Sequence, residues 1–162
     1  MTAASVRTVV LERLLQASPV QVWRALTTKA GLEAWWGPEG FTTQVHKIDL
    51  RAGGQWHYAM TATDPAMVEF MRRAGMPLTH EVTATYTEVV PRQRLRYAHR
   101  IDFVPGVAPY ETAALIELHA AAAQVRLVVT LDAMHDEQWT ARAREGWESQ
   151  LGRLTRCVAS AA

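Results

Sequence analysis

The sequence has very little cysteine, since Cys157 is the only thiol among 162 residues. A single cysteine excludes an internal disulfide and a zinc site built from cysteines, and it is typical of a reducing compartment. The sequence also lacks a long apolar run, and no charged amino-terminal segment precedes an apolar stretch. We therefore predict a cytoplasmic protein with no membrane insertion.

Net charge is almost absent as well. The chain carries 17 Lys and Arg against 16 Asp and Glu, a formal charge of +1. Such a balance offers no basic stripe for nucleic-acid phosphates, so we expect no nucleic-acid partner. Apolar residues are abundant, at 49 % of the chain, which is enough for the core of one ordinary domain. No repeat or linker divides the sequence, and we predict a single domain over residues 1–162.

The spacing of apolar residues predicts an α+β protein with an antiparallel sheet of six to seven strands. The expected strands cover residues 6–15, 42–50, 55–61, 81–90, 95–103, 113–119 and 125–131. Two short helices are expected after the first strand, one capped by Ser18 and the next by Thr28. An inserted short helix is expected near residues 65–74, and a long amphipathic helix over 137–159.

The first predicted hairpin takes its register from its apolar face. The expected pairs are Leu50 with Trp56, Ile48 with Tyr58, and His46 with Met60. In this register His46 and His57 point to opposite faces of the sheet, which argues against a shared metal.

The second predicted hairpin contains the chain's most attractive polar groups. Turning between Val90 and Leu95, it would pair Tyr86 with His99 and Glu88 with Tyr97, all facing inward. His99 and Glu88 are thereby candidates for acid and base catalysis. The alternative is that the four side chains only satisfy one another's hydrogen bonds.

A curved sheet lifts away from a straight helix at its wide end, and the space between them becomes a pocket. We predict that this pocket holds a ligand against mostly aromatic side chains with a few polar tips. The predicted ligand-binding residues are Trp36, Trp56, Tyr58, Met60, Phe70, Met71, Tyr86, Tyr97, His99 and Trp147. The methionine-rich insertion is a candidate lid over the entrance. Two alternatives remain: the aromatic stripe is plain core, or the insertion is an interface with a second subunit.

The sequence offers little support for metal or covalent chemistry. No two histidines are spaced by four residues on an expected helix, and no Gly-x-Ser-x-Gly motif is present. Cys157 falls near the apolar stripe of the last helix, where a small packing residue is expected. We therefore expect no metal and no cofactor.

Several segments carry a resemblance to a known family. They are Val22–Leu26, Trp35–Phe41, Asp49–Gly54, Glu88–Leu95, and Gly146-Trp147 with Leu151 and Leu154. Through them the chain resembles the bacterial relatives of the activator of heat-shock protein 90 ATPase, within the SRPBCC group of START-like and birch-pollen-allergen-like proteins. The resemblance covers nearly the whole chain. It implies a helix-grip fold, in which the curved sheet wraps around the long carboxy-terminal helix.

For function the resemblance implies a range, because ligand carriers, cyclases, aromatase-like enzymes and chaperone activators share this fold. The chain departs from the common bacterial pattern in the insertion from about Asp64 to Leu78, where a short loop is usual. It also lacks the separate amino-terminal domain of the full-length chaperone activator, so co-chaperone activity is not expected.

Our leading hypothesis is noncovalent binding of a small hydrophobic or aromatic molecule between the sheet and the last helix. Such binding requires no chemistry. One alternative is an enzyme of the cyclase or hydrolase type that uses the same cavity. Another is a chaperone-interacting or self-associating module, such as a homodimer.

Overall fold

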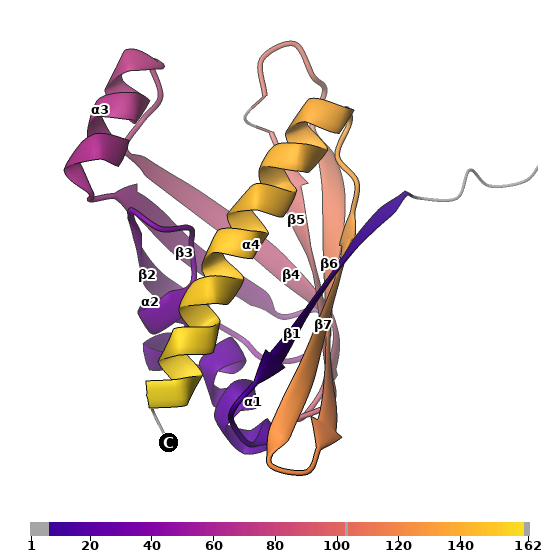
Figure 1. The fold of residues 1–162 in the computed structure, drawn as a ribbon. Coiled ribbons are helices and arrows are strands. Elements are labelled where there is room, and N and C mark those ends of the chain that lie inside the picture. Colours follow the sequence, from indigo (N-terminus) through magenta and orange to yellow (C-terminus); the bar gives the residue numbers. More distant parts are fainter. Residues whose placement is uncertain (1–6, 103, 161–162) are drawn as a thin grey trace, which may run out of the picture.

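The protein, described as a computed structural model over residues 7–102 and 104–160, contains seven strands and four helices in that range (Figure 1). The strands are β1 (Thr8–Leu15), β2 (Phe41–Ile48), β3 (Gln55–Ala62), β4 (Thr79–Val90), β5 (Arg94–Ile101), β6 (Tyr110–Ala121) and β7 (Gln124–Asp132). The helices are α1 (Pro19–Thr27), α2 (Lys29–Trp35), α3 (Pro65–Arg73) and α4 (Glu137–Ser160). Val6 and Phe103, at the ends of two predicted strands, lie outside the described residues.

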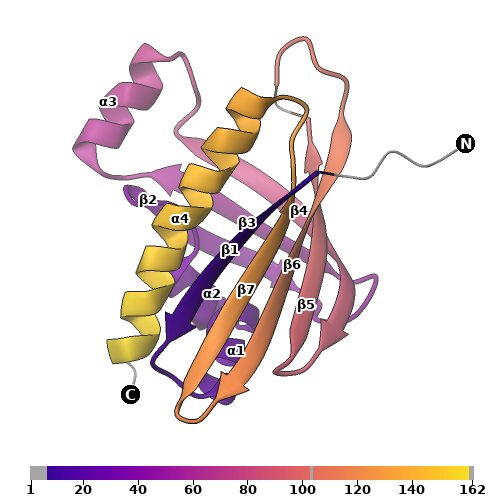
Figure 2. The ribbon, with the colours of Figure 1, turned by 45° about the vertical axis from the view of Figure 1, so that its right-hand side comes forward.

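All seven strands join one antiparallel sheet in the order β1-β7-β6-β5-β4-β3-β2. The sheet curves around α4, which crosses its concave face diagonally (Figure 2). This is the predicted α+β helix-grip architecture. No helix in the described ranges is long and apolar enough to cross a bilayer.

The two short helices begin at the predicted caps. Ser18 Oγ accepts from the Gln21 backbone N–H, and Gln21 Oε1 accepts from the Ser18 N–H, which is a capping box. Thr28 ends α1 and starts α2, where its Oγ1 accepts from the Gly31 N–H. A Cβ at Gly31 would lie 2.4 Å from the Arg24 carbonyl oxygen, so only glycine permits this tight connection.

The register predicted for the first hairpin is wrong by two residues near the turn and by three farther along the strands. Ile48 pairs with Trp56, and Val45 pairs with Tyr58. The turn is longer than expected because the Asp49 N–H donates to the Gln55 carbonyl, which ends the ladder before Leu50. A Cβ at Gly54 would lie only 2.0 Å from the Asp49 carbonyl oxygen, so this wide turn depends on a glycine there.

A bulge between Val45 and Lys47 then changes the faces of β2. It brings the His46 ring to 4.9 Å from the His57 ring, so the prediction that these histidines point to opposite faces is also wrong. Both Nε2 atoms contact the same Glu81 carboxylate oxygen, at 3.3 Å for His46 and 3.0 Å for His57. This cluster lies away from α4, since Trp56 and Tyr58 on either side of His57 face inward.

The second hairpin also differs from its predicted register. Its turn pairs Val90 with Arg94 and places Arg92 in the left-handed region, with φ of 62°. A further bulge between Tyr86 and Glu88 makes Tyr86 the partner of Tyr97. The extra residue reverses the alternation of β4, so Glu88 pairs with Arg96 and faces outward.

Candidate ligand-binding cavity

A cavity of about 570 Å³ lies between the amino-terminal half of α4 and the concave face of the sheet. The helix contributes Trp139, Arg142, Ala143, Gly146, Trp147 and Gln150 to its wall. The strands contribute inward side chains, among them Tyr58, Met60, Val82, His99, Ile101, Thr112, Ala114 and Leu131. This volume is in the range of small-molecule sites.

The cavity exists because the two halves of α4 carry side chains of different size. Leu151, Leu154 and Val158 are buried, and α4 packs on α1, α2 and β1. One to two turns earlier, the positions facing the sheet hold Ala143 and Gly146. Small side chains there leave the space that sheet curvature opens, and the gap stays unfilled by protein.

The Trp35–Phe41 segment holds the closed end of the cavity in place. Arg153 Nη1 donates to the carbonyl oxygens of Gly37 at 2.9 Å and Phe41 at 3.1 Å, and lies 3.4 Å from those of Trp36 and Pro38. Gln150 Oε1 accepts from the Gly37 N–H at 3.1 Å. One of the segments that carry the family resemblance is therefore a part of the chain on which α4 docks.

Docking of this segment places Trp36 in the cavity wall. Its ring packs edge-on against Trp147 at 5.3 Å and against Tyr58 at 5.9 Å. Trp36 and Tyr58 are almost fully buried, whereas Trp147 is half-buried and faces the open space. The closed end is thus a set of aromatic faces and edges, which suits flat apolar ligands.

One polar pair interrupts this apolar surface. Tyr58 OH lies 3.3 Å from His99 Nε2, within hydrogen-bonding distance. Burial lowers the pKa of His99 to about 4 and raises the pKa of Tyr58, so both groups are neutral at neutral pH. The pair can donate or accept hydrogen bonds without placing a charge in the cavity.

Three further polar atoms lie behind this wall. Trp56 Nε1, Tyr86 OH and Tyr97 OH are buried and make no hydrogen bond within the described part of the protein. The Trp56 and Tyr97 rings are 5.5 Å apart, and Tyr86 pairs with Tyr97 across the strands. Burial raises the pKa of both of these tyrosines, which keeps them neutral.

The structure places half of the predicted ligand-binding residues in the cavity wall: Trp36, Tyr58, Met60, His99 and Trp147. Trp56, Tyr86 and Tyr97 lie in the core beneath it. Glu88 lies outside, where it forms an ion pair with Arg94 at 2.6 Å.

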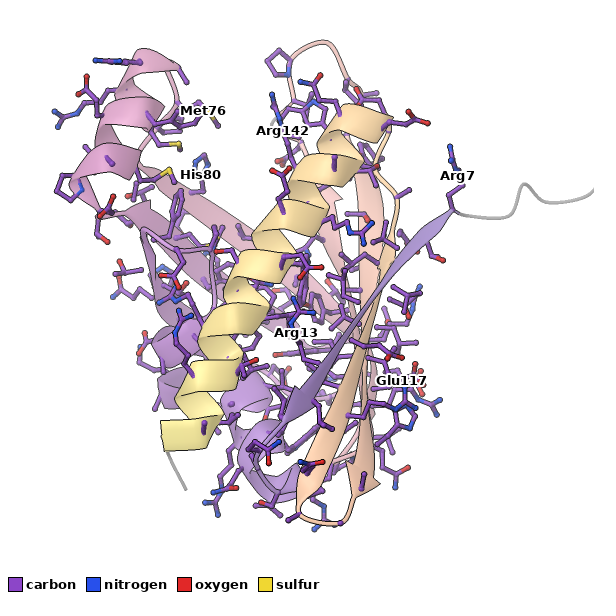
Figure 3. All side chains as sticks on the ribbon, viewed as in Figure 1. Arg7, Arg13, Met76, His80, Glu117 and Arg142 are labelled. Atoms are coloured by element: carbon purple, nitrogen blue, oxygen red, sulfur yellow. The ribbon has the colours of Figure 1, made fainter. Side chains whose placement is uncertain are left out.

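The two predicted residues of the insertion lie on α3, which projects from the β3 and β4 ends of the sheet (Figure 1). Phe70 is 61 % exposed and Met71 is buried, and neither lines the cavity. Figure 3 shows Met76 and His80 on this side of the molecule and Arg142 on the α4 side. No lining residue comes from α3 itself, so α3 stands beside the cavity and does not cover it in this conformation.

The lining residues of α4 that are missing from the sequence prediction are Trp139, Arg142, Ala143, Gly146 and Gln150. A signal was available, because positions 139, 143, 146, 147 and 150 repeat at the spacing of one helix face. Within the described ranges, no group of three or more His, Cys, Asp or Glu side chains is arranged to hold a metal ion.

The family model described as Activator of Hsp90 ATPase homolog 1-like protein matches residues 16–159. The chain belongs to this family. Membership agrees with the resemblance carried by the Trp35–Phe41 and Glu88–Leu95 segments, and with the helix-grip fold of the SRPBCC superfamily. Among curated proteins, no significant match was found.

Solved structures of bacterial proteins have the same fold. A protein from Chromobacterium violaceum is 28 % identical, with a TM-score of 0.77 over 93 % of this chain and 96 % of that one. An AHSA1 protein from Silicibacter pomeroyi is 21 % identical, with a TM-score of 0.75 over 96 % and 100 %. An AHSA1-like protein from Aeromonas hydrophila is 19 % identical, with a TM-score of 0.73 over 96 % and 94 %. Since a shared fold does not select a function, the function is argued from this chain's own cavity.

Proposed function

We propose that this family member binds a small hydrophobic or aromatic molecule, noncovalently, in the cavity beneath the amino-terminal half of α4. The observation that supports this most is the wall itself, which is mostly aromatic and aliphatic and carries the neutral Tyr58 and His99 pair at its closed end. A mostly apolar wall with a few fixed polar groups is the usual composition of small-molecule sites. The reducing cytoplasm remains the compartment in which we expect this binding.

Two parts of the wall would contribute in different ways. The rings of Trp36 and Trp147 offer apolar area, and each Å² removed from water is worth about 25 cal/mol. The Tyr58 and His99 pair offers one hydrogen bond at a fixed place, which orients a ligand that has a hydroxyl or carbonyl group. A charged group at this depth is disfavoured because burial already keeps His99 neutral.

Gly146 provides a direct test of this proposal. A Cβ added there meets nothing within 4 Å, and the residue lines the cavity. Gly146→Phe should therefore fill the cavity without disturbing the helix backbone. The matched control is Ala141→Phe, which adds the same ring at an exposed position of the same helix.

Native mass spectrometry and thermal shifts against a panel of aromatic and aliphatic compounds give the readout. A ligand that binds the folded state raises the melting temperature with concentration. We expect shifts for the wild type and Ala141→Phe, and none for Gly146→Phe. A shift that survives in Gly146→Phe would place binding elsewhere and contradict the proposal.

A second candidate function, catalysis in the same cavity, has one specific observation in its favour. His99 is neutral, lies in the cavity wall and is oriented by Tyr58, as a general base would be. Glu88, the other predicted candidate, is no longer part of this proposal because it faces away. If a substrate is found, unchanged turnover in His99→Asn would remove this candidate.

A further inference from the structure

The charged residues around the cavity differ in where their side chains point. Glu81, Arg100 and Asp132 occupy strand positions that alternate with inward-facing ones, so their charges belong to the opposite face of the sheet. The contacts of the first two agree: Glu81 pairs with the two histidines of the outer cluster, and Arg100 lies 3.8 Å from Asp102, the remaining charged residue on the sheet side of the lining. Asp132 Oδ2 accepts from the Ala113 backbone N–H.

Arg142 differs from these residues because it comes from the helix that covers the concave face. It flanks the lining positions Trp139 and Gly146, one turn away on either side, and its guanidinium carbon lies 5.0 Å from the centre of the Trp139 ring. No ion pair joins Arg142 to a carboxylate of the described residues. Figure 3 shows it beside the upper part of α4, toward Met76 and His80.

The cavity therefore has a charge gradient along its length. Its closed end is aromatic and carries the uncharged Tyr58 and His99 pair. Its exposed end carries one cation whose charge is not neutralised by a neighbouring acid. A guanidinium held against an aromatic ring is a preformed partner for a planar anion.

We infer that the ligand class of this cavity is the amphipathic carboxylic acid, with its carboxylate at Arg142 and its apolar body between Trp147 and the sheet. A carboxylate suits the site better than a phosphate dianion, because the concave side of the described lining supplies a single cation. This inference rests on the proposed function and goes beyond it by naming the polar end of the ligand.

The test uses three probes with one apolar body: 2-naphthylacetate, 2-naphthylacetamide and 2-(2-naphthyl)ethylamine. Calorimetry or ligand-observed NMR gives their affinities for the wild type. We expect the acid to bind about fivefold more tightly than the amide, as one partly exposed charge pair allows, and the amine to bind most weakly. The preference for the acid should shrink as salt is raised.

Arg142→Gln isolates the charge while leaving a polar side chain in place. We expect this variant to lose the preference for the acid over the amide. Arg144→Gln, at an exposed position two residues away and outside the lining, is the matched control and should keep the preference.

The outcomes separate this inference from the proposed function. Equal binding of acid and amide to the wild type, or a preference that persists in Arg142→Gln, would overturn the carboxylate inference and leave the proposed cavity function in place. Binding of none of the three probes to the wild type would overturn both.

Discussion

The two halves of α4 lie over the same sheet and have the same helical spacing, yet one half builds the core and the other leaves a cavity. Leu151 and Leu154 are fully buried, whereas Trp139 and Trp147 are half-buried beside open space. The difference comes from the residues between the large ones: Ala143 and Gly146 in the first half leave room that the second half fills. Amphipathic spacing thus locates a helix face, and side-chain volume decides whether that face closes.

The largest effect should come from truncating the core half. We expect Leu154→Ala to lower the free energy of unfolding by about 3 to 4 kcal/mol, because it opens a void in a packed site. Trp139→Ala removes more atoms from the cavity half but should cost only about 1 kcal/mol, since its ring already borders open space. Urea denaturation measures the free energy of unfolding of both variants. Equal losses of stability would contradict the difference between the core half and the cavity half of α4.

Low pH should decrease the free energy of unfolding through His99, which lies in the cavity wall. Burial lowers the pKa of His99 from its ordinary 6.5 to about 4, so the unfolded chain takes up a proton that the folded state refuses. The contribution is fully present above about pH 6.5 and is lost as the pH falls through about 4, by about 3 kcal/mol in all.

Denaturation at a series of pH values, compared between wild type and His99→Asn, isolates this contribution from that of the carboxylates. The wild type should lose more stability than the variant over this interval. His119→Asn, at an exposed histidine, should follow the wild type. Parallel curves for wild type and His99→Asn would mean that His99 is protonated as readily in the folded state as in the unfolded chain.

The junction between the halves depends on Arg153. Arg153→Met should cost about 2 kcal/mol, because carbonyl oxygens of the 36–41 loop lose a charged donor. Arg156→Met removes an exposed ion pair with Glu39 and should cost less than about 0.5 kcal/mol. Equal costs, measured by chemical denaturation, would show that the loop contacts are no stronger than a surface ion pair.

Removing a tyrosine hydroxyl should have opposite effects on stability in the cavity wall and in the core behind it. Tyr58→Phe removes a hydrogen bond to His99 and should cost about 1 kcal/mol. Tyr97→Phe removes a buried hydroxyl that bonds to no described protein atom, so stability should rise by about 0.5 kcal/mol. Chemical denaturation measures both changes. A loss of stability in Tyr97→Phe would indicate that a bound water or ligand forms a hydrogen bond with this hydroxyl.

The smallest effect is a gain. Gly146→Ala and Gly152→Ala should each raise stability by about 0.5 kcal/mol, since alanine favours the helix and neither added Cβ meets a clash. Gly146→Ala should also keep ligand binding, because one methyl group leaves most of the cavity open. If Gly146→Ala lost ligand binding and Gly152→Ala did not, the space beside Gly146 alone would distinguish the cavity half of α4 from the core half.

Element order and fold class were predictable because each strand alternates and each helix has a cap or an amphipathic stripe, as Ser18 and Thr28 show. Registers were not, because the turn of the first hairpin is longer than expected, and because bulges near His46 and Thr87 add one residue to a strand without a local signal. Each bulge reverses the faces beyond it, which is why Glu88 was expected inside the cavity and lies outside.

The cavity wall was predictable where aromatic residues form it and unpredictable where small residues do. Trp36 and Trp147 were expected because large aromatics are conspicuous in a sequence. Gly146 and Ala143 matter through the space they leave, which depends on the curvature of strands far away in the chain. Arg142 looks like any solvated helix residue until the partners of the other charged groups are known.

The hydrogen bonds from Arg153 to the 36–41 loop also affect how fast the proposed ligand would exchange. With the middle of α4 held, the whole helix cannot lift away, so entry and exit must use its amino-terminal end. That end is held by Asp136, which accepts from the Trp139 N–H, and by the Tyr110 hydroxyl, which contacts His135. Residence time can therefore change independently of affinity, through side chains that a ligand in the cavity would never touch.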